Sequence, residues 1–260
     1  MIIHAYLTNG FFCWAKLFLE SFKFHHGEAT PVFLSTRELK QDDIDELYSI
    51  YSNLIVSNKN FDIDQMAKNA KVSKSILLNY KHQVENSHVT ENSKVWKNMI
   101  ADDDRIKEIY DCIGMNLDKQ YMLHFDIDMY FRENIKDLFE LVRSNDISIR
   151  LRLKSKLTRK TMIGVQGYRL KPLILRFMKA WIENIESVPV YDRPAGHGQA
   201  ACFLAYDKFK HHLKWGNVPS RFISPRMLKT DAIWSANTVK GKDNMIKLFN
   251  KDFEEIRRNG

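Results

Sequence analysis

The first sixty residues alternate between short apolar runs and amphipathic segments, and this order most restricts the folds available to the chain. Three runs have the composition of strands, at residues 2–8 (IIHAYLT), 32–35 (VFLS) and 53–57 (NLIVS). Between them, residues 12–25 carry apolar side chains at helical spacing, and residues 42–51 begin as an acidic helix. This strand–helix–strand–helix–strand order predicts a mostly parallel central sheet flanked by helices.

The remainder of the chain extends the α/β pattern. Residues from about 59 to 118 contain no strand-like run, so we expect two or three helices there, including 73–86 and 94–112, laid across the sheet. Further strands are predicted at 147–153 and 161–167, a helical turn at 134–142, and further helices at 171–186, 198–209 and 243–257. No repeat, linker or domain boundary interrupts the chain, so residues 1–260 are expected to form one domain.

Residues 121–131 (YMLHFDIDMYF) form an apolar run that is interrupted by two carboxylates, Asp126 and Asp128. We expect Tyr121 to Phe125 to form a buried strand that delivers this pair to its carboxyl end, where open α/β sheets bind ligands. In an extended segment, residues i and i+2 point to the same side, so both carboxylates can face one spot. A divalent cation such as Mg²⁺ or Mn²⁺ would compensate the two charges and bind phosphate oxygens. A solvated turn at the end of a strand is the alternative interpretation.

The composition is typical of a globular protein in a reducing compartment. Hydrophobic residues make up 44% of the chain and charged residues 28%, and no stretch approaches the ~18 apolar residues of a membrane span. Residues 1–10 lack the basic region and cleavage site of a signal peptide. The three cysteines lie far apart with no C-x-x-C, which favours free thiols. We therefore expect a cytoplasmic location, at the inner face of a membrane if the basic surface binds anionic lipid.

The net charge of +8 favours anionic partners such as nucleotides, nucleic acid, phosphorylated glycans or an acidic membrane surface. Much of the excess lies in residues 150–160 (RLRLKSKLTRK), which contain six basic residues and no acidic one. The alternation with leucines indicates a strand with one basic face. Two interpretations are open, an edge strand that is protected from aggregation by charge and a binding surface. No nucleic-acid-binding motif accompanies the segment, so we expect no specific nucleic-acid partner.

Three blocks of sequence follow one another in an order that is found in a known enzyme family. They are residues 2–35, residues 124–139 (HFDIDMYFRENIKDLF), and residues 162–181 followed by GHGQAACFLAY at 196–206. In these blocks the chain resembles nucleotide-sugar-dependent glycosyltransferases of the GT-A type, in particular the retaining glycogenin- and galactosyltransferase-like group. The blocks are similar to that family's opening strand–helix–strand, its aspartate-x-aspartate strand with a "DLF" turn, and its acceptor-side strand with the "DQ" helix start.

The resemblance implies a single GT-A-like domain, with a nucleotide-binding half at 1–131, an acceptor-binding half at 132–260, and a helical insertion before the aspartate-x-aspartate strand. It also implies a Mn²⁺ or Mg²⁺ ion held between the aspartate pair and the diphosphate of the donor, where it acts as a Lewis acid. On this hypothesis, Asp128 ligates the metal directly, and Asp126 contacts the ribose or binds the metal through water.

The implied reaction moves a hexose from a nucleoside-diphosphate sugar, with a UDP-sugar as the expected donor, to a glycan, a lipid-linked glycan or a protein. Thr8 and Asn9, at the end of the first predicted strand, would contact the base and ribose of the donor. Ser35 and Arg37, at the end of the second, are candidates of the same kind. Ordinary turn chemistry explains Thr8 and Asn9 equally well.

One part of the resemblance is incomplete near the C-terminus. Many relatives supply a histidine metal ligand there in a His…Gly-x-Lys context, but the matching stretch, IWSANTVKGKDN at 233–244, has no histidine. Ser235 or Asn237 could supply an oxygen ligand instead. Lys240 and Lys242 could then reach the diphosphate as point charges. A polar loop that caps the terminal helix is the alternative interpretation.

The acceptor side also departs from the family, because Gly198-Gln199 stands where the resemblance places Asp-Gln. This change leaves the choice between retaining and inverting chemistry open. Gln199 could place a polar group beneath the sugar, as retaining enzymes do. His197 could instead be the general base of an inverting reaction, and Asp192 is a further candidate base. A solvated loop histidine is the alternative for His197.

Three other functions compete with glycosyl transfer. Asp126 and Asp128 also resemble the first motif of haloacid-dehalogenase-like phosphatases, but Met129 and Tyr130 replace the Gly-Thr that follows it, and an entire α/β unit precedes it. A sugar-phosphate nucleotidylyltransferase would need a glycine-rich, arginine-containing loop after the first strand, which this sequence lacks. A non-enzymatic, basic nucleic-acid-binding protein that uses residues 150–160 would leave the aspartate pair unexplained.

Overall fold

The apolar runs of the N-terminal part form parallel strands, and those at the centre of the sheet are buried on both faces. In the computed structural model, β1 (Ile2–Thr8) pairs in parallel with β2 (Val32–Arg37) and with β4 (Tyr121–Asp126). β2 pairs in parallel with β3 (Leu54–Lys59). Successive side chains of a strand point to opposite faces, so nearly continuous apolar runs suit a sheet that is covered on both sides.

The structure describes residues 1–85, 93–223, 227–235 and 242–259, and its central sheet has seven strands in the order β3-β2-β1-β4-β7-β6-β8. β7 is antiparallel to both of its neighbours, whereas the other pairs in this sheet are parallel. The remaining strands of this sheet are β6 (Ile147–Leu151), β7 (Thr161–Arg169) and β8 (Trp215–Asn217). A separate two-stranded sheet pairs β5 (Met129–Phe131) with β9 (Ile233–Ser235).

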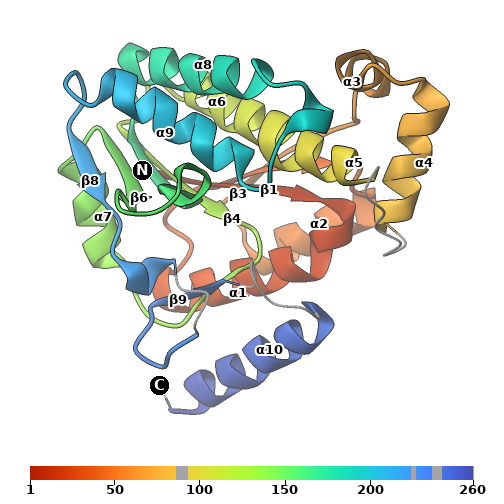
Figure 1. Ribbon diagram of the computed structural model, residues 1–260. Coiled ribbons are helices and arrows are strands. Elements are labelled where there is room, and N and C mark those ends of the chain that lie inside the picture. Colours follow the sequence, from red (N-terminus) through yellow and green to blue (C-terminus); the bar gives the residue numbers. More distant parts are fainter. Residues whose placement is uncertain (86–92, 224–226, 236–241, 260) are drawn as a thin grey trace.

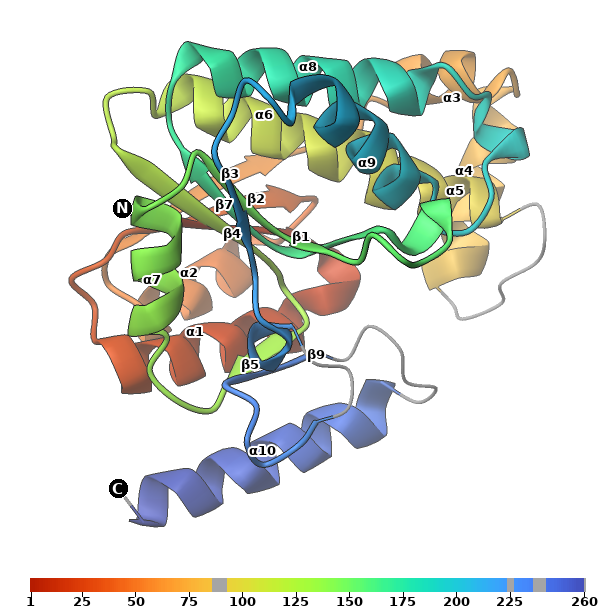
Figure 2. The same cartoon turned by 60° about the vertical axis from the view of Figure 1, so that its left-hand side comes forward.

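Helices cover both faces of the central sheet (Figure 1; Figure 2). One apolar core lies beneath α1 (Phe12–His26), α2 (Gln41–Ile50) and α7 (Lys136–Arg143). A second core lies on the opposite face, beneath α6 (Arg105–Met115), α8 (Pro172–Glu186) and α9 (His197–Phe209). The mixed α/β fold class with a mostly parallel central sheet is therefore confirmed.

Two smaller units adjoin these layers. The predicted helical insertion before β4 is confirmed and has its own small core around Phe61 and Trp96. It consists of α3 (Ile63–Ala70), α4 (Lys74–Glu85), α5 (Lys94–Asn98) and the π-helical turn η2 (Met99–Asp104). At the other end of the chain, α10 (Lys242–Asn259) packs Phe249 against Trp14 of α1 and Tyr130 of β5. The 3-10 turns within the described residues are η1 (Asn9–Phe11), η3 (Leu157–Arg159), η4 (Val190–Asp192) and η5 (Ser220–Phe222).

Two local predictions need correction. The second aspartate is not part of an extended strand, because β4 ends at Asp126 and a turn at residues 127–128 leads into β5. Residues 150–160 do not form a basic strand, because β6 ends at Leu151 and the basic residues continue in a loop. The edge-strand interpretation of this segment is also wrong, since β6 lies between β7 and β8.

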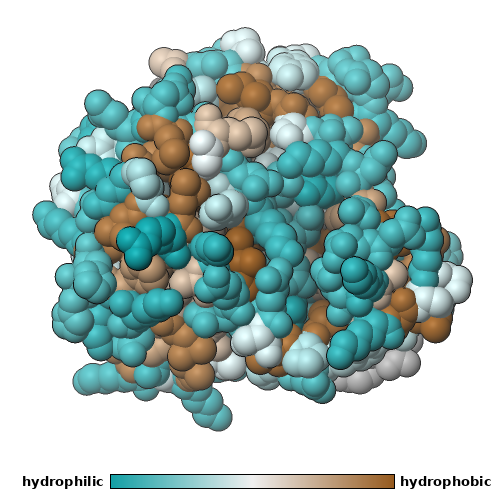
Figure 3. Space-filling view, turned by 90° about the horizontal axis from the view of Figure 1, so that it is seen from above, coloured by the Kyte–Doolittle hydropathy of each residue, from teal (hydrophilic) through white to brown (hydrophobic). Residues whose placement is uncertain are grey.

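The outer surface over the α8 side is mostly hydrophilic, with hydrophobic side chains gathered in separate patches (Figure 3). Isolated patches of this kind are ordinary on a folded protein. Among the described helices, none combines the length and apolar character that crossing a bilayer requires.

Candidate functional site

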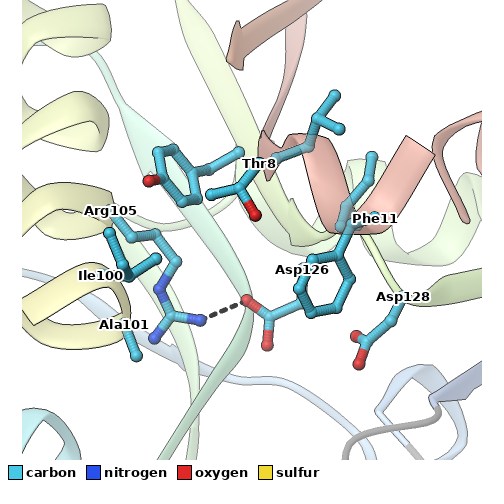
Figure 4. A pocket seen from close by; sticks show the side chains of 10 residues that line it. Thr8, Phe11, Ile100, Ala101, Arg105, Asp126 and Asp128 are labelled. Carbon is cyan, nitrogen blue, oxygen red and sulfur yellow. Dashed lines mark hydrogen bonds and ion pairs between the residues drawn. The ribbon is translucent and has the colours of Figure 1, made fainter. Parts of the chain in front are cut away.

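A pocket of about 180 Å³ opens at the carboxyl ends of β1 and β4, which are neighbours in the sheet. This is the edge at which open α/β sheets place their ligand sites. One wall comes from the end of β1 and from η1, the floor from the end of β4, and the opposite wall from η2 and the first residue of α6 (Figure 4). The lining residues are Tyr6, Leu7, Thr8, Phe11, Ile100, Ala101, Arg105, Asp126, Ile127 and Asp128.

Both aspartates of the pair line this pocket, although only one belongs to the strand. Asp126 and Asp128 are 8% and 5% exposed, so both carboxylates are largely removed from water. Ile127 between them is buried as well, and the turn brings the second carboxylate round to the pocket (Figure 4). Two anionic groups buried side by side require compensation by positive charge or donors.

Arg105 provides part of that compensation. Its guanidinium donates to Asp126 Oδ1 at 2.6 Å, across the pocket from the start of α6 (Figure 4). The other carboxylate oxygen lies so close to β7 that a Cβ added at Gly164 would be 2.9 Å from Asp126 Oδ2. A glycine at this position therefore gives the Asp126 carboxylate its room, while Arg105 sets its orientation.

The wall formed by η2 is held by a buried ionic network beneath the pocket. Arg37 at the end of β2 is 5% exposed and donates to Asp104 at 2.8 Å and to Glu108. Tyr6 donates to the same Asp104 at 2.6 Å, and both burial and this carboxylate raise the pKa of the tyrosine. Burial opposes ionisation of Glu108, but hydrogen bonds from Lys59 and Arg37 lower the pKa of its carboxyl. The network fixes the helical wall to the ends of the strands.

A second polar chain crosses the sheet below the pocket. His4 of β1 lies between two neighbours, with its ring nitrogens 2.9 Å from His124 Nδ1 and 3.1 Å from Ser35 Oγ. Burial lowers the pKa of both histidines, so both rings are neutral near pH 7. His124 Nε2 lies 3.8 Å from Asp126 Oδ1, so this chain ends at the first aspartate of the pair.

The four residues predicted to contact the donor lie in different places. Thr8 lines the pocket, and Asn9 is exposed on η1 beside it. Ser35 and Arg37 are buried at the end of β2, where their side chains bond to His4 and to the two acidic residues of the network. They support the pocket from below and do not line it.

The structure places one of the four C-terminal candidates next to the aspartate pair. Ser235 of β9 is the backbone partner of Met129, the residue after Asp128, and it is 3% exposed. Asn237 and Lys240 lie outside the described residues, and Lys242 is the first residue of α10. The C-terminal segment therefore does reach the pocket edge, through the small β5–β9 sheet.

The donor set around the pair suits a hard cation that is shared with a substrate. Mg²⁺ and Mn²⁺ take oxygen ligands, and Mg²⁺ is commonly held by one or two carboxylates together with substrate phosphates. Asp126 and Asp128 offer carboxylate oxygens here, while Ser235 lies opposite Met129 in the small sheet and does not line the pocket. Among the described residues, no group of three or more His, Cys, Asp or Glu side chains is arranged to hold a metal alone. The residues present fit a cation that a phosphate ligand helps to bind.

The three candidates for acid–base chemistry do not line the pocket. His197 begins α9 and is 7% exposed, with Nε2 3.1 Å from Ile185 O, so it is a buried residue and not a solvated loop histidine. Gln199, with its amide oriented to donate, lies 2.7 Å from Thr158 O. Asp192 is exposed on η4.

The first turn of α9 nevertheless contacts the η2 wall of the pocket, and the side chain on η2 that it contacts is another carboxyl, Asp102. Asp102 follows Ile100 and Ala101 on η2 and packs against Gly198, where an added Cβ would overlap its Oδ1. Burial raises the pKa of the Asp102 carboxyl, and nearby cations oppose the shift. A carboxyl thus occupies the space that a side chain at position 198 would need.

The sequence interpretation did not single out Tyr6, Phe11, Arg105 or the η2 residues. A usable signal was present at residues 101–105 (ADDDR), where three acids and an arginine interrupt a predicted amphipathic helix. Their position relative to Asp126 depends on how the helical insertion folds back over the sheet. That arrangement is a long-range property of the fold, which periodicity does not report.

Known proteins resemble this chain in fold and not in sequence. No protein-family model matches the chain, and no curated protein matches it in sequence. The galactosyltransferase LgtC, solved with donor and acceptor sugar analogs, is similar with a TM-score of 0.57 and 12% identity, over 99% of this chain and 96% of LgtC. The chain has a GT-A-like fold. An active-site mutant of LgtC gives 0.55 and 11% over 98% of this chain and 96% of that one. The glycosyltransferase GlyE of Streptococcus pneumoniae TIGR4 gives 0.55 and 9% over 96% of this chain and 59% of GlyE.

The network beneath the pocket makes a prediction about stability. Arg37→Met should lower the free energy of unfolding by about 3–5 kcal/mol, because it leaves two acidic side chains without their shared buried cation. Lys59→Met is the matched control, since Lys59 is 44% exposed and bonds the same Glu108 at 2.8 Å. We expect it to cost only about 0–1 kcal/mol in urea denaturation. Equal costs for the two variants would contradict the assignment of Arg37 as the cation on which the wall depends.

Proposed function

We propose that this chain is a glycosyltransferase that moves a sugar from a nucleoside-diphosphate sugar to a glycan acceptor. The observation that carries the proposal is the pocket at the ends of β1 and β4, which Asp126 and Asp128 line together with Thr8 and Arg105 within a GT-A-like fold. LgtC, which shares this fold, has been solved with donor and acceptor sugar analogs. No finding favours a phosphatase or a nucleic-acid-binding protein.

The donor's nucleotide end suits the composition of this pocket. Phe11, Ile100 and Ala101 offer apolar and aromatic surface for a base, and the Thr8 hydroxyl can bond the ribose. The volume of about 180 Å³ is below the ~300–1,000 Å³ of a typical small-molecule site, so the pocket would hold part of the donor. We place the nucleotide there and the sugar toward α9. All ten lining residues lie within 1–131, the proposed nucleotide-binding half.

The aspartate pair would hold a Mn²⁺ or Mg²⁺ ion together with the donor diphosphate. When bound, such an ion supplies Lewis-acid stabilisation of the leaving nucleoside diphosphate. Asp128 is proposed as the direct ligand, and Asp126, which accepts from Arg105 through Oδ1, as a ligand through water or a contact to the ribose. Arg105 orients the Asp126 carboxylate, and its remaining N–H groups can bond phosphate oxygens. A UDP-sugar is the proposed donor.

The acceptor-binding half would then be residues 132–260, which include α9 and its contact with η2. Here we propose that Asp102 supplies the acceptor-side carboxyl that Gly198 lacks. Two observations support this role: Asp102 occupies the space of a side chain at 198, and burial raises its pKa toward the range useful for proton transfer. The carboxyl can thus accept or orient a proton of the acceptor hydroxyl.

Ligand stabilisation tests the donor site. UDP and UDP-sugars should raise the midpoint of thermal unfolding more with Mn²⁺ than without it. A ligand at 100 times its Kd stabilises the native state by ~2.7 kcal/mol. In Asp128→Asn the Mn²⁺-dependent part of the shift should be lost.

Asp118→Asn is the control for this experiment. Asp118 is an exposed aspartate in the turn before β4 and pairs with Lys119 at 3.1 Å, so its loss should leave the ligand shift intact. A full Mn²⁺-dependent shift in Asp128→Asn would overturn the metal assignment. No shift in the wild type with any sugar nucleotide would overturn the proposed function.

A swap of side chains tests Asp102. Asp102→Ala should lower kcat for transfer by at least ~100-fold, the lower end of the range for general acid–base catalysis, without changing the affinity for UDP. Gly198→Asp alone should be harmful, because its side chain would overlap Asp102. The double variant should recover transfer, since a carboxyl returns to the same space. If the double variant has no more activity than either single variant, the carboxyl is not the property that matters at this position.

A further inference from the structure

The loop between β6 and β7 carries an uncompensated basic charge on a projecting surface. It runs from residue 152 to residue 160, and it is closed by a hydrogen bond from Arg152 N–H to Lys160 O at 2.6 Å. Figure 2 shows this segment, drawn in green, passing beyond the sheet alongside the amino-terminal end of α9. We name residues 150–160, which are this loop and the last two residues of β6, the basic loop.

Its positive charges have no acidic partners in the described part of the chain. The basic loop contains six Lys and Arg residues, and none of them forms an ion pair with a described carboxylate. The exposed members are Arg152, Lys154, Lys156 and Arg159. Elsewhere on the surface, some bases do pair with carboxylates, such as the exposed Lys74 and the half-buried Lys107. A surface that concentrates unpaired charge attracts an anionic partner.

Exposed leucines stand among these charges. Leu153 is 57% exposed and Leu157 is 44% exposed. A basic loop that contacts only water gains no stability from apolar side chains at these positions. Single exposed leucines are ordinary, but two of them flanked by lysines and arginines on a projecting loop are the composition of a membrane-interface segment. The basic loop contains no aromatic residue, whereas single-stranded nucleic-acid surfaces rely on aromatic stacking.

The loop is fixed to α9 and so presents these side chains on a defined surface. The Gln199 amide nitrogen, oriented to donate, lies 2.7 Å from Thr158 O and 3.0 Å from Thr161 O. Thr161 Oγ1 in turn donates to Gln199 O at 2.7 Å. The ammonium of Lys160 lies over the ring of Phe203 at 4.3 Å. A preformed surface loses less conformational entropy when it binds than a flexible one.

The basic loop lies on the same edge of the sheet as the pocket. β6 runs parallel to β4, because both are antiparallel to β7. The carboxyl ends of β4 and β6 therefore point to one edge, and the loop extends from that edge. Asp126, at the end of β4, and Arg152, just after β6, therefore both lie at this edge.

We propose that the basic loop binds the surface of a bilayer that contains acidic phospholipid. The exposed bases contact the lipid phosphates, and Leu153 and Leu157 enter the boundary between headgroups and acyl chains. The edge that carries the pocket then faces the membrane. If the proposed function holds, on which this last step rests, the acceptor is a glycan on a lipid anchor, because such an acceptor is held at the height of the pocket.

Vesicle sedimentation tests the proposal. The full chain should sediment with vesicles of phosphatidylglycerol and phosphatidylcholine, and not with phosphatidylcholine alone. Replacing Arg152, Lys154 and Lys156 by Gln should weaken binding at least about tenfold, since each cation near an acidic surface adds to the attraction. Leu153→Ser with Leu157→Ser should weaken binding while the dependence on acidic lipid remains.

A charge-matched control removes three exposed bases from α3 and α8 by replacing Lys68, Arg176 and Lys179 with Gln. This control should keep vesicle binding, because the net charge changes equally in the two triple variants. Equal losses in both would show a general charge effect and overturn the assignment of the basic loop. Absence of vesicle binding by the wild type, or vesicle binding unchanged in the loop triple variant, would also overturn it. If the loop triple variant instead lost binding to a duplex oligonucleotide and the wild type ignored vesicles, a nucleic-acid partner would replace the membrane.

The outcome is separable from that of the proposed function. Stabilisation by UDP and Mn²⁺ should be unchanged in the loop triple variant, because none of the three substituted residues lines the pocket. Vesicle binding without nucleotide binding would leave the membrane surface standing and refute the glycosyltransferase. Nucleotide binding without vesicle binding would do the reverse.

Discussion

The ion pair between Arg105 and Asp126 joins the two parts of the chain that make the pocket. Asp126 ends a central strand among buried residues, and its charge would be costly there without a donor. Arg105 begins α6, so the 2.6 Å contact brings the end of the helical insertion over the end of the sheet. The remaining features follow from this juxtaposition: a wall from η2, a floor from β4, and a second carboxylate on the turn after Asp126.

A second layer of charge keeps that wall in place. Arg37 is shared by Asp104 and Glu108, and Tyr6 donates to the first of these acids. A buried network of this kind contributes less to net stability than its Coulomb energy suggests, because burial removes each charge from water. Its effect is to hold η2 in the position in which these hydrogen bonds form. Loss of Arg37 leaves Asp104 and Glu108 without the buried cation that they share. The pocket is thus shaped in part by Arg37, Asp104 and Glu108, which do not line it.

Much of the fold was predictable from local pattern. The runs at 2–8 and 32–35 became parallel strands that are buried on both faces, whereas the run at 53–57 became the edge strand β3, on which Ile55 is exposed. The amphipathic spacing after residue 171 became α8. Residues 150–160 misled the interpretation, since alternation of leucine with bases fits a strand and an exposed loop equally well. Arg105 was not predicted as a site residue, because its place in the pocket depends on a hydrogen bond to Asp126, which is twenty-one residues further along the chain.

The central claim is that the aspartate pair binds a cation and a nucleoside diphosphate as one unit. Binding of the two ligands must then be coupled, and the coupling must be the same in both directions. Calorimetry can measure it, by titrating UDP with and without saturating Mn²⁺, and Mn²⁺ with and without saturating UDP, with correction for the Mn²⁺–UDP complex formed in solution. The account predicts that each ligand tightens the other by the same factor, about tenfold or more. Affinity for UDP that does not change with Mn²⁺ would contradict it.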